Sequence, residues 1–355
     1  MRPHNRRRAL LASGGGGPLI YKGSITPLSA ARYSLAATTA GGYALFAGGF
    51  TATAVQLRVN AYDGALTRST PTSLSEARAQ LAATTVGDYA LFGGGNTGSE
   101  TASSVVDAYD GALTHSTPSA LSTARFGLAA TTVGSYALFG GGKYKNGDYL
   151  PARTTVNAYN ASLTRSTPTA LSVARGDLAA TTVGDYALFA GGLTVSNSVV
   201  TYGAEVNAYN ASLTRSTPTA LSVARYDLAA TTVGNYALFA GGALEDYSAS
   251  TVVDAYDGAL TRSTPIALST ARYYMAATTV GSYGIFAGGT KSITAIRAQD
   301  IYDVALTKVT VGRLPAARHS HAAVTVGGYA LFGGGRVSGD YSGYVDTVDG
   351  YKIRS

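Results

Sequence analysis

Two histidines are the side chains of this sequence whose type and spacing best suit metal chemistry. His319 and His321 lie two positions apart, and on a strand two such residues share a face and could ligate one ion. No third ligand is identifiable, so we expect no metal site. The chain has no cysteine, and no carboxylate pair, Ser/His/Asp set or phosphate-binding loop occurs at a diagnostic spacing. We therefore expect a non-catalytic protein without a cofactor.

An Ala-Arg pair recurs seven times along the chain. Its arginines are Arg32, Arg78, Arg125, Arg175, Arg225, Arg272 and Arg318, with spacings of 46, 47, 50, 50, 47 and 46 residues. Seven guanidinium groups could form an anion-binding ring if they met at the mouth of a symmetric fold. Because every repeat carries one, we favour a structural role in which they hydrogen-bond loop carbonyls between repeats.

Each arginine is followed by a unit that reads as strands. The unit is a version of LAATTVGDYALFAGG, then a variable stretch, then VNAYDGALTRSTPTALS. The LAATTV segment is rich in Thr and Val and ends at Gly-Asp, Gly-Ser or Gly-Asn, which is typical of a two-residue hairpin turn. The short apolar YALFAGG run predicts a second strand that is buried on both faces.

The rest of the unit predicts two more strands. The V-[ND]-A-Y segment is the third, and LTRST, ended by a proline in five repeats, is the fourth and suits a sheet edge. The sequons at Asn160 and Asn210 lie in the turn between them, which is a sufficient explanation for their sequence. Four antiparallel strands per repeat make one propeller blade. The sequence therefore predicts an all-β fold, a seven-bladed β-propeller of four-stranded antiparallel blades.

The ends of the chain predict how the ring closes. Leu19–Ser29 resembles the end of a repeat that has no start, and the last repeat, from Arg318, runs out near Val348. We expect the N-terminal strand at Ile25 to join and complete the C-terminal blade. The alternative is that Tyr351–Arg354 supplies that strand itself.

These repeats resemble the kelch repeat. The order of Arg, small-residue strand, Gly-Gly, variable loop and Val-x-x-Tyr-Asp covers about residues 19–350, and the copy from Arg318 to Gly335 is the closest. The usual kelch Trp is missing throughout, and a leucine takes its place at Leu66, Leu113, Leu163, Leu213, Leu260 and Leu306. The resemblance implies a protein that binds through one face. The copper-dependent kelch enzymes need a Cys-modified Tyr, which this chain cannot build.

The repeats differ from one another in two zones. One zone follows each glycine pair, over Phe50–Arg58, Asn96–Ser104, Lys143–Thr155, Leu193–Glu205, Ala243–Thr251, Thr290–Gln299 and Arg336–Tyr344. The other is the dipeptide after each repeated arginine, such as Tyr226-Asp227. Because strand direction alternates, both zones are expected on one face of the ring, whereas the turns on the opposite face hardly change.

The variable zones carry ten of the 25 tyrosines. Tyrosine together with Ser, Gly and Asn is the composition of antibody-like recognition surfaces, and Tyr rings also suit sugars. The alternative is that these loops vary only because they are loops. The candidate ligand-binding residues are Tyr33, Tyr144, Tyr149, Tyr202, Tyr226, Asp227, Tyr247, Tyr273, Tyr274, His319, Arg336, Tyr341 and Tyr344.

Residues 1–17 form a basic, glycine-rich arm, and residues 18–355 form the single propeller domain. Four of the seven net positive charges lie in the arm, at Arg2, Arg6, Arg7 and Arg8, so the propeller is nearly neutral and we expect no nucleic-acid partner. The apolar stretch of the arm is too short for a signal peptide, and no segment is long enough for a membrane helix. We expect a soluble protein without membrane insertion. The opening MRPHNRRRALLA is similar to those of bacteriophage tail and virion proteins.

These observations together predict a recognition module. We expect it to bind a cell-surface glycan or protein receptor through the variable face, with the arm anchoring it to other subunits of a virion, a phage tail or a surface adhesin. A virion or extracellular surface location follows from that role. The first alternative is a structural scaffold protein whose variable face contacts other subunits, and the second is a sugar-active propeller enzyme.

Overall fold

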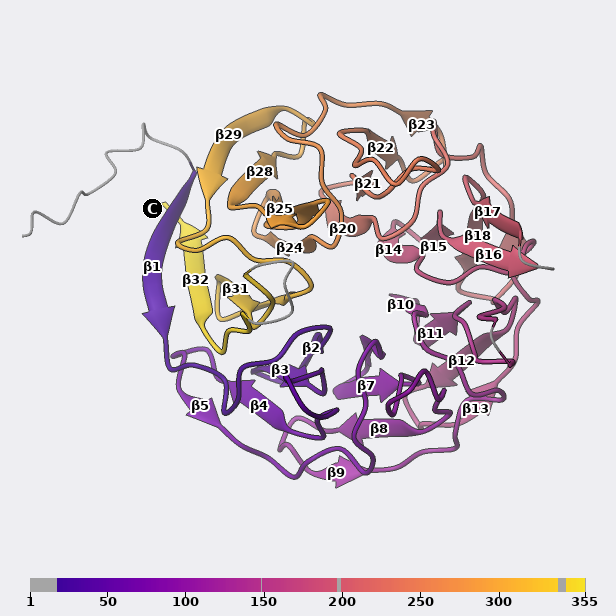
Figure 1. The fold of residues 1–355 in the computed structure, drawn as a ribbon, viewed down its shortest axis with the longest axis horizontal. Helices are drawn as coiled ribbons and strands as arrows, with labels where there is room; N and C mark the ends of the chain where they lie inside the picture. Colours follow the sequence, from indigo (N-terminus) through magenta and orange to yellow (C-terminus); the bar gives the residue numbers. More distant parts are fainter. Residues whose placement is uncertain (1–17, 148, 197–198, 338–342, 355) are drawn as a thin grey trace, which may run out of the picture.

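The chain forms a ring of seven four-stranded antiparallel sheets, a seven-bladed β-propeller (Figure 1). The computed structural model describes residues 18–147, 149–196, 199–337 and 343–354. We number the blades 1 to 7 in chain order, from the sheet that begins at Ala36 to the sheet that begins at Ala322. The predicted fold class is confirmed. Within the described ranges no helix is long and apolar enough to span a membrane.

The innermost strands alternate between buried and half-buried residues and line the central channel. They are β2 (Ala36–Ala40), β6 (Ala82–Val86), β10 (Ala129–Val133), β14 (Ala179–Val183), β20 (Ala229–Val233), β24 (Ala276–Val280) and β30 (Ala322–Val326). Their threonines link neighbouring blades, as where Thr38 and Thr85 share a 2.9 Å hydrogen bond. Five further junctions repeat this bond. Val324 stands at that position in blade 7, where no such hydroxyl exists.

The second strands supply most of the core. They are β3 (Tyr43–Ala47), β7 (Tyr89–Gly93), β11 (Tyr136–Gly140), β15 (Tyr186–Ala190), β21 (Tyr236–Ala240), β25 (Tyr283–Ala287) and β31 (Tyr329–Gly333). All but the first residue of each is buried, as the apolar run predicts. Both faces are covered by neighbouring blades: Leu45 of blade 1 packs in one cluster with Phe92 of blade 2, and Phe46 packs with Leu331 of blade 7.

The third strands carry the polar position that receives the repeated arginine. They are β4 (Val59–Tyr62), β8 (Val106–Tyr109), β12 (Val156–Asn160), β18 (Val206–Asn210), β22 (Val253–Tyr256), β28 (Ala298–Tyr302) and β32 (Val348–Ile353). Arg125 donates from Nη2 to the carbonyl of Phe139 (3.1 Å) and to Oδ1 of Asn157 (3.0 Å), both in its own blade. The expectation that these side chains bond between repeats is therefore wrong.

The arginines also form no anion-binding ring, because all seven are 0–1% exposed. The acceptor on the third strand is Asp in blades 2, 5, 6 and 7 and Asn in blades 1, 3 and 4. Burial lowers the pKa of Arg32, Arg125 and Arg175, the three that face Asn, to about 10, which leaves them charged at neutral pH. The backbone of the arginine does link blades, since Gly49 N donates to Arg78 O at 3.0 Å.

The outer strands are short in five blades and long in the last two. They are β5 (Arg68–Ser69), β9 (His115–Ser116), β13 (Arg165–Ser166), β19 (Arg215–Ser216), β23 (Arg262–Ser263), β29 (Lys308–Arg313) and β1 (Leu19–Ile25). Strand β1 is the outer strand of blade 7 and pairs with β32 from Leu19↔Ile353 to Ile25↔Val348. The N-terminal segment thus joins the C-terminal blade, and Tyr351 belongs to the third strand of that blade.

On the face opposite the variable loops, one polar residue builds the turn between the third and fourth strands in each of blades 1 to 6. In blade 3, Oδ1 of Asn160 accepts hydrogen bonds from the backbone N–H of Ser162 (3.0 Å) and of Thr164 (2.9 Å). Asp63 makes the same two bonds in blade 1. The amide of the Asn160 sequon is therefore already engaged in a turn.

Removal of β1 should open the ring. A chain that lacks residues 1–28 loses the β1–β32 pairing and the buried Leu28, so we expect its Tm to fall by about 5–10 °C. A chain that begins at Pro18 is the matched control in thermal denaturation. Equal Tm values for the two chains would contradict closure by β1.

Substitution of the buried ion pair in blade 5 should be asymmetric. Arg225→Met leaves Asp254 buried without its 2.7 Å partner, and loss of one member of a buried ion pair costs about 3–5 kcal/mol. Asp254→Asn recreates the acceptor found in blades 1, 3 and 4, so we expect a loss of only about 1 kcal/mol. Urea denaturation measures the free energy of unfolding of both variants. Equal losses of this free energy would show that the charge of Asp254 decides stability.

Candidate functional site

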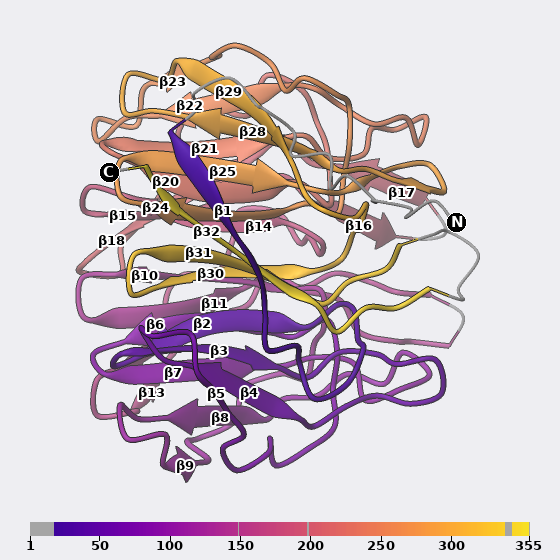
Figure 2. The ribbon, with the colours of Figure 1, turned by 90° about the vertical axis from the view of Figure 1, so that its left-hand side faces the viewer.

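The two variable zones lie on one face of the ring, which we call the variable-loop face. In blade 5, Tyr226 and Ala243 form an antiparallel bridge with N–H to carbonyl distances of 3.1 and 2.8 Å. The equivalent bridges are Tyr33–Phe50, Ala79–Asn96, Phe126–Lys143, Gly176–Leu193, Tyr273–Thr290 and His319–Arg336. Figure 2 shows this face at the right, marked by the hairpin of β16 (Leu193–Ser196) and β17 (Val199–Tyr202). Blade 6 carries a shorter hairpin there, β26 (Thr290–Lys291) and β27 (Thr294–Ala295).

A closed ring of backbone hydrogen bonds surrounds the mouth of the central channel on this face. The second residue of each variable dipeptide donates its N–H to the carbonyl of its counterpart in the preceding blade, over 2.8–3.2 Å. The seven residues are Ser34, Gln80, Gly127, Asp177, Asp227, Tyr274 and Ser320, and all have φ between 52° and 60°. Left-handed backbone is costly for residues other than glycine and is maintained only when the surroundings impose it. The ring therefore places six side chains and Gly127 around a cavity of about 220 Å³.

A lysine and two aspartates from three blades meet at this mouth. Lys143 of blade 3 forms a salt bridge with Asp177 of blade 4, and the charge of Asp177 acts on Asp227 of blade 5. Glycines make room for the pair, because a Cβ on Gly176 would collide with the Lys143 stem and one on Gly127 with the Asp177 carboxylate. The side chains in this ring are thus fitted to one another.

The environment of the mouth shifts three ionisation equilibria. Burial, followed by the negative charge of Asp177, raises the pKa of Asp227 well above its usual value, although the Tyr274 hydroxyl donates a hydrogen bond to it. The charge of Asp227, followed by burial, raises the pKa of Tyr274. Burial opposes the charge on Lys143, but Asp177 outweighs it and the pKa of Lys143 is raised. A carboxyl group whose pKa is raised by burial and by a neighbouring carboxylate is an arrangement common at functional sites.

Five of the predicted tyrosines gather on blades 4 to 6. The rings of Tyr202 and Tyr226 lie 5.6 Å apart, and those of Tyr273 and Tyr274 lie 5.1 Å apart. Burial and a hydrogen bond with Tyr247 raise the pKa of Tyr202. Tyr247 is 68% exposed and Tyr274 is 42% exposed. These residues place tyrosines both at the channel mouth, where Tyr274 lines the cavity, and in the loops of blades 4 and 5, where Tyr202 lies.

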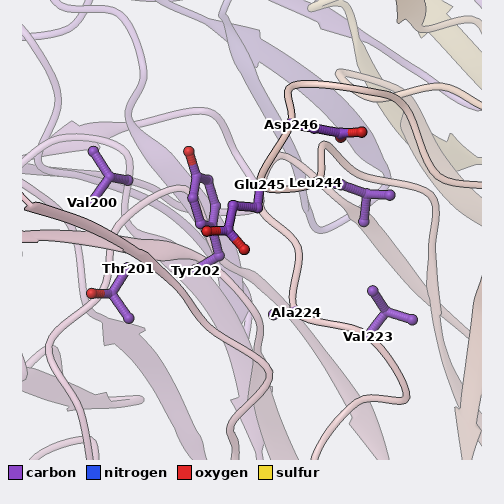
Figure 3. A pocket seen from close by; sticks show the side chains of 8 residues that line it. All are labelled: Val200, Thr201, Tyr202, Val223, Ala224, Leu244, Glu245 and Asp246. Carbon is purple, nitrogen blue, oxygen red and sulfur yellow. The ribbon is translucent and has the colours of Figure 1, made fainter.

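A groove of about 740 Å³ lies beside these tyrosines, between the loops of blades 4 and 5. Its lining is Val200, Thr201, Tyr202, Val223, Ala224, Leu244, Glu245 and Asp246. In Figure 3 the Tyr202 ring stands beside the Glu245 side chain, whereas Asp246 points away from that ring. The charge of Glu245 contributes to the raised pKa of Tyr202, and Asp246 caps its own loop through Ser248 N at 2.9 Å. The groove thus combines an aromatic ring, exposed valines and a carboxylate.

A second predicted group packs together at the junction of blades 7 and 1. Tyr33 and Tyr344 stack with their centroids 5.2 Å apart, and the Arg336 guanidinium lies 5.0 Å from the Tyr33 ring. Arg336 and His319 are buried, at 9% and 7% exposure. The sequence placed both among the exposed candidates, but they are packed inside the face rather than presented on it.

The remaining candidates lie apart from these groups or beyond the described part of the chain. Tyr144 lies under the guanidinium of Arg153, 3.6 Å from it, and Tyr149 is half exposed on the same loop. Tyr341 lies outside the described residues. The arm residues Arg2, Arg6, Arg7 and Arg8 also lie outside them.

The two histidines belong to no cluster of metal-ligating side chains in the described part of the chain. Among the described residues no group of three or more His, Cys, Asp or Glu side chains is placed to hold an ion. His321 occupies the position that a leucine holds in most blades, and it packs 6.0 Å from the Phe332 ring. Burial lowers its pKa well below the usual value, so the ring is neutral.

Sequence reasoning did not single out Lys143, Asp177, Arg153 or Glu245. Each lies inside a variable zone, in which the tyrosines are the more conspicuous residues. For Lys143 and Asp177 the sequence does contain an indication, because Gly127 and Gly176 stand where most other repeats have bulkier residues. Without a Cβ, these glycines leave room for the salt bridge.

No protein-family model matches the chain, and no curated protein matches it significantly. Solved structures do match, among them that of the protein YjhT, with a TM-score of 0.60 at 12% identity. The match covers 78% of this chain and 97% of YjhT. This likeness shows the propeller fold alone.

The raised pKa of Asp227 predicts a pH-dependent stability. The folded chain holds this proton more tightly than the unfolded chain, whose Asp titrates near 3.8, so the free energy of unfolding falls as pH rises from that value through the folded pKa. Asp227→Asn removes this titration and keeps the shape. We expect its Tm, relative to the unmodified chain, to improve steadily with increasing pH, and a pH-independent difference would contradict the shift.

Proposed function

We propose that this propeller is a non-catalytic recognition module that binds a cell-surface glycan or protein receptor through its variable-loop face. The observation that carries the proposal is the meeting of the two variable zones on one face, where neighbouring loops form pockets while the opposite turns keep one repeated design. A face that varied without selection for binding has no reason to gather exposed tyrosines on adjacent blades.

The groove between blades 4 and 5 supports a glycan as the ligand. Its volume of about 740 Å³ lies in the range of small-ligand sites. Tyr202 offers a ring face to the apolar side of a sugar, and Glu245 offers acceptors to sugar hydroxyls. Exposed Val200 and Val223 add an apolar wall. Rigid aromatic contacts with few adjustable polar groups give selectivity at low entropic cost.

The larger role that we propose is attachment. The basic arm at residues 1–17 would bind other subunits of a virion, phage tail or surface adhesin, and the kelch-like propeller would then face the host surface. The scaffold alternative differs only in what the variable-loop face contacts. The enzyme alternative draws on one observation, the raised pKa of Asp227 next to Asp177, since carboxyl groups with raised pKa values serve acid–base chemistry.

Binding of the chain to a glycan array and to a panel of bacterial cells tests the proposal. We expect selective binding that falls about 10- to 30-fold in the Tyr202→Ala/Tyr247→Ala variant, because central aromatic contacts contribute about 1.5–2 kcal/mol or more. The matched control carries Asp185→Ala and Asn235→Ala, exposed turn residues of the same two blades on the opposite face.

The outcomes separate the three roles. Binding that is lost in the tyrosine variant and kept in the control supports recognition by this groove. No binding to any glycan or cell, with loss of assembly in the tyrosine variant, would favour the scaffold. Conversion of an array glycan that stops in Asp227→Asn would favour the enzyme.

A further inference from the structure

The groove between blades 4 and 5 has a counterpart between blades 2 and 3. That second groove measures about 520 Å³. Both are built from the loop of one blade, the two residues before the arginine of the next blade, and the loop of that next blade. The lining of the second groove is Thr101, Ala102, Thr123, Ala124, Tyr144, Lys145 and Arg153. Each groove also contains one loop tyrosine, Tyr202 in the first and Tyr144 in the second.

The walls of the two grooves carry opposite charges. Where the first groove has Glu245 and Asp246, the second has Lys145 and Arg153. The guanidinium of Arg153 lies over the Tyr144 ring, 3.6 Å from its centroid, and its Nε is buried with no hydrogen-bond partner among the described residues. Lys145 lies 3.5 Å from the exposed Glu100, and an exposed pair of this kind contributes little and is readily exchanged.

The arginine that follows the lining residues in sequence also differs in its partner. Arg125 is buried and faces neutral Asn157, whereas Arg225, which follows Ala224 of the first groove, faces Asp254. Arg125 donates from Nη1 to Oγ1 of Thr123 at 3.1 Å, which leaves the Thr123 O–H able to donate into the groove. The first groove has Val223 at that place. The second groove thus has cationic side chains in place of acidic ones and a hydroxyl in place of a valine, and the buried arginine beside it has a neutral partner in place of an aspartate.

We infer that the groove between blades 2 and 3 binds an anionic group, a carboxylate, sulfate or phosphate, of the ligand. Arg153 and Lys145 supply the positive charge, the Thr123 hydroxyl supplies a donor, and Tyr144 supports the guanidinium plane as aromatic rings do. The inference rests on the proposed function and extends it, because a charged saccharide would then be read by two grooves of opposite character.

An NMR titration of the ¹⁵N-labelled chain tests this inference at constant ionic strength. The probes are sodium glucuronate, sodium sulfate and glucose, the last a neutral counterpart of the first. We expect glucuronate to shift the backbone amides of Ala124 and Tyr144 in a saturable way and glucose to leave them unmoved. Saturation by sulfate as well would show that the anion alone suffices, and saturation by glucuronate only would show that the sugar ring is also read.

Two variants and one control make the test specific. Arg153→Gln removes a wall charge, and Asn157→Asp gives Arg125 the partner that blade 5 has naturally, so this second variant is expected to fold. We expect each to weaken anion affinity about 5- to 10-fold, whereas Lys291→Gln, on the exposed hairpin of blade 6, should not.

No saturable shift with either anion, or equal affinity in all three variants, would overturn the inference. Neither of these results would change the outcome of the glycan-array experiment with the Tyr202/Tyr247 variant. A failure of the anionic groove is therefore distinguishable from a failure of the proposed function.

Discussion

Packing of blade against blade is the interaction on which the rest of this structure depends. A single blade presents a second strand that is apolar on both faces, and burying one Leu or Phe contributes about 1.5–3 kcal/mol against an ordering cost of about 1–2 kcal/mol per residue. Both faces must therefore be covered. Phe139 of blade 3 lies so close over Gly93 of blade 2 that a Cβ there would collide with the ring. The same demand explains why β1 and β32, from the two ends of the chain, share one sheet.

This rigid ring is what allows the variable-loop face to vary. The hydrogen bonds around the channel mouth use backbone atoms only, so the same bond forms whether the residue is Gln80, Gly127, Asp177 or Tyr274. The left-handed backbone at these positions is imposed by ring closure and not by the side chain. Each blade can therefore change the group it aims at the mouth without a change in its fold, and Lys143 with Asp177 is one outcome of that freedom.

The interior and the face are electrostatically connected. Burial lowers the pKa of Arg125, and the charge of Arg153 on the loop above contributes to the lowering. The choice of Asn157 or of an aspartate as its partner thus alters the potential beneath a groove without altering any groove residue. The acceptor on the third strand is Asn in three blades and Asp in four, so the buried charge differs between blades although their backbone is regular.

The sequence by itself determined the seven repeats, the four strands of each, and the gathering of both variable zones on one face, because these follow from periodicity and alternating strand direction. Only the tertiary structure decided which side chains meet. It buried Arg336 and His319, kept the repeated arginines inside their own blades, and joined Lys143 to Asp177 across 34 residues of chain. Such contacts depend on how neighbouring blades are rotated and spaced around the axis, and no repeat pattern encodes that geometry residue by residue.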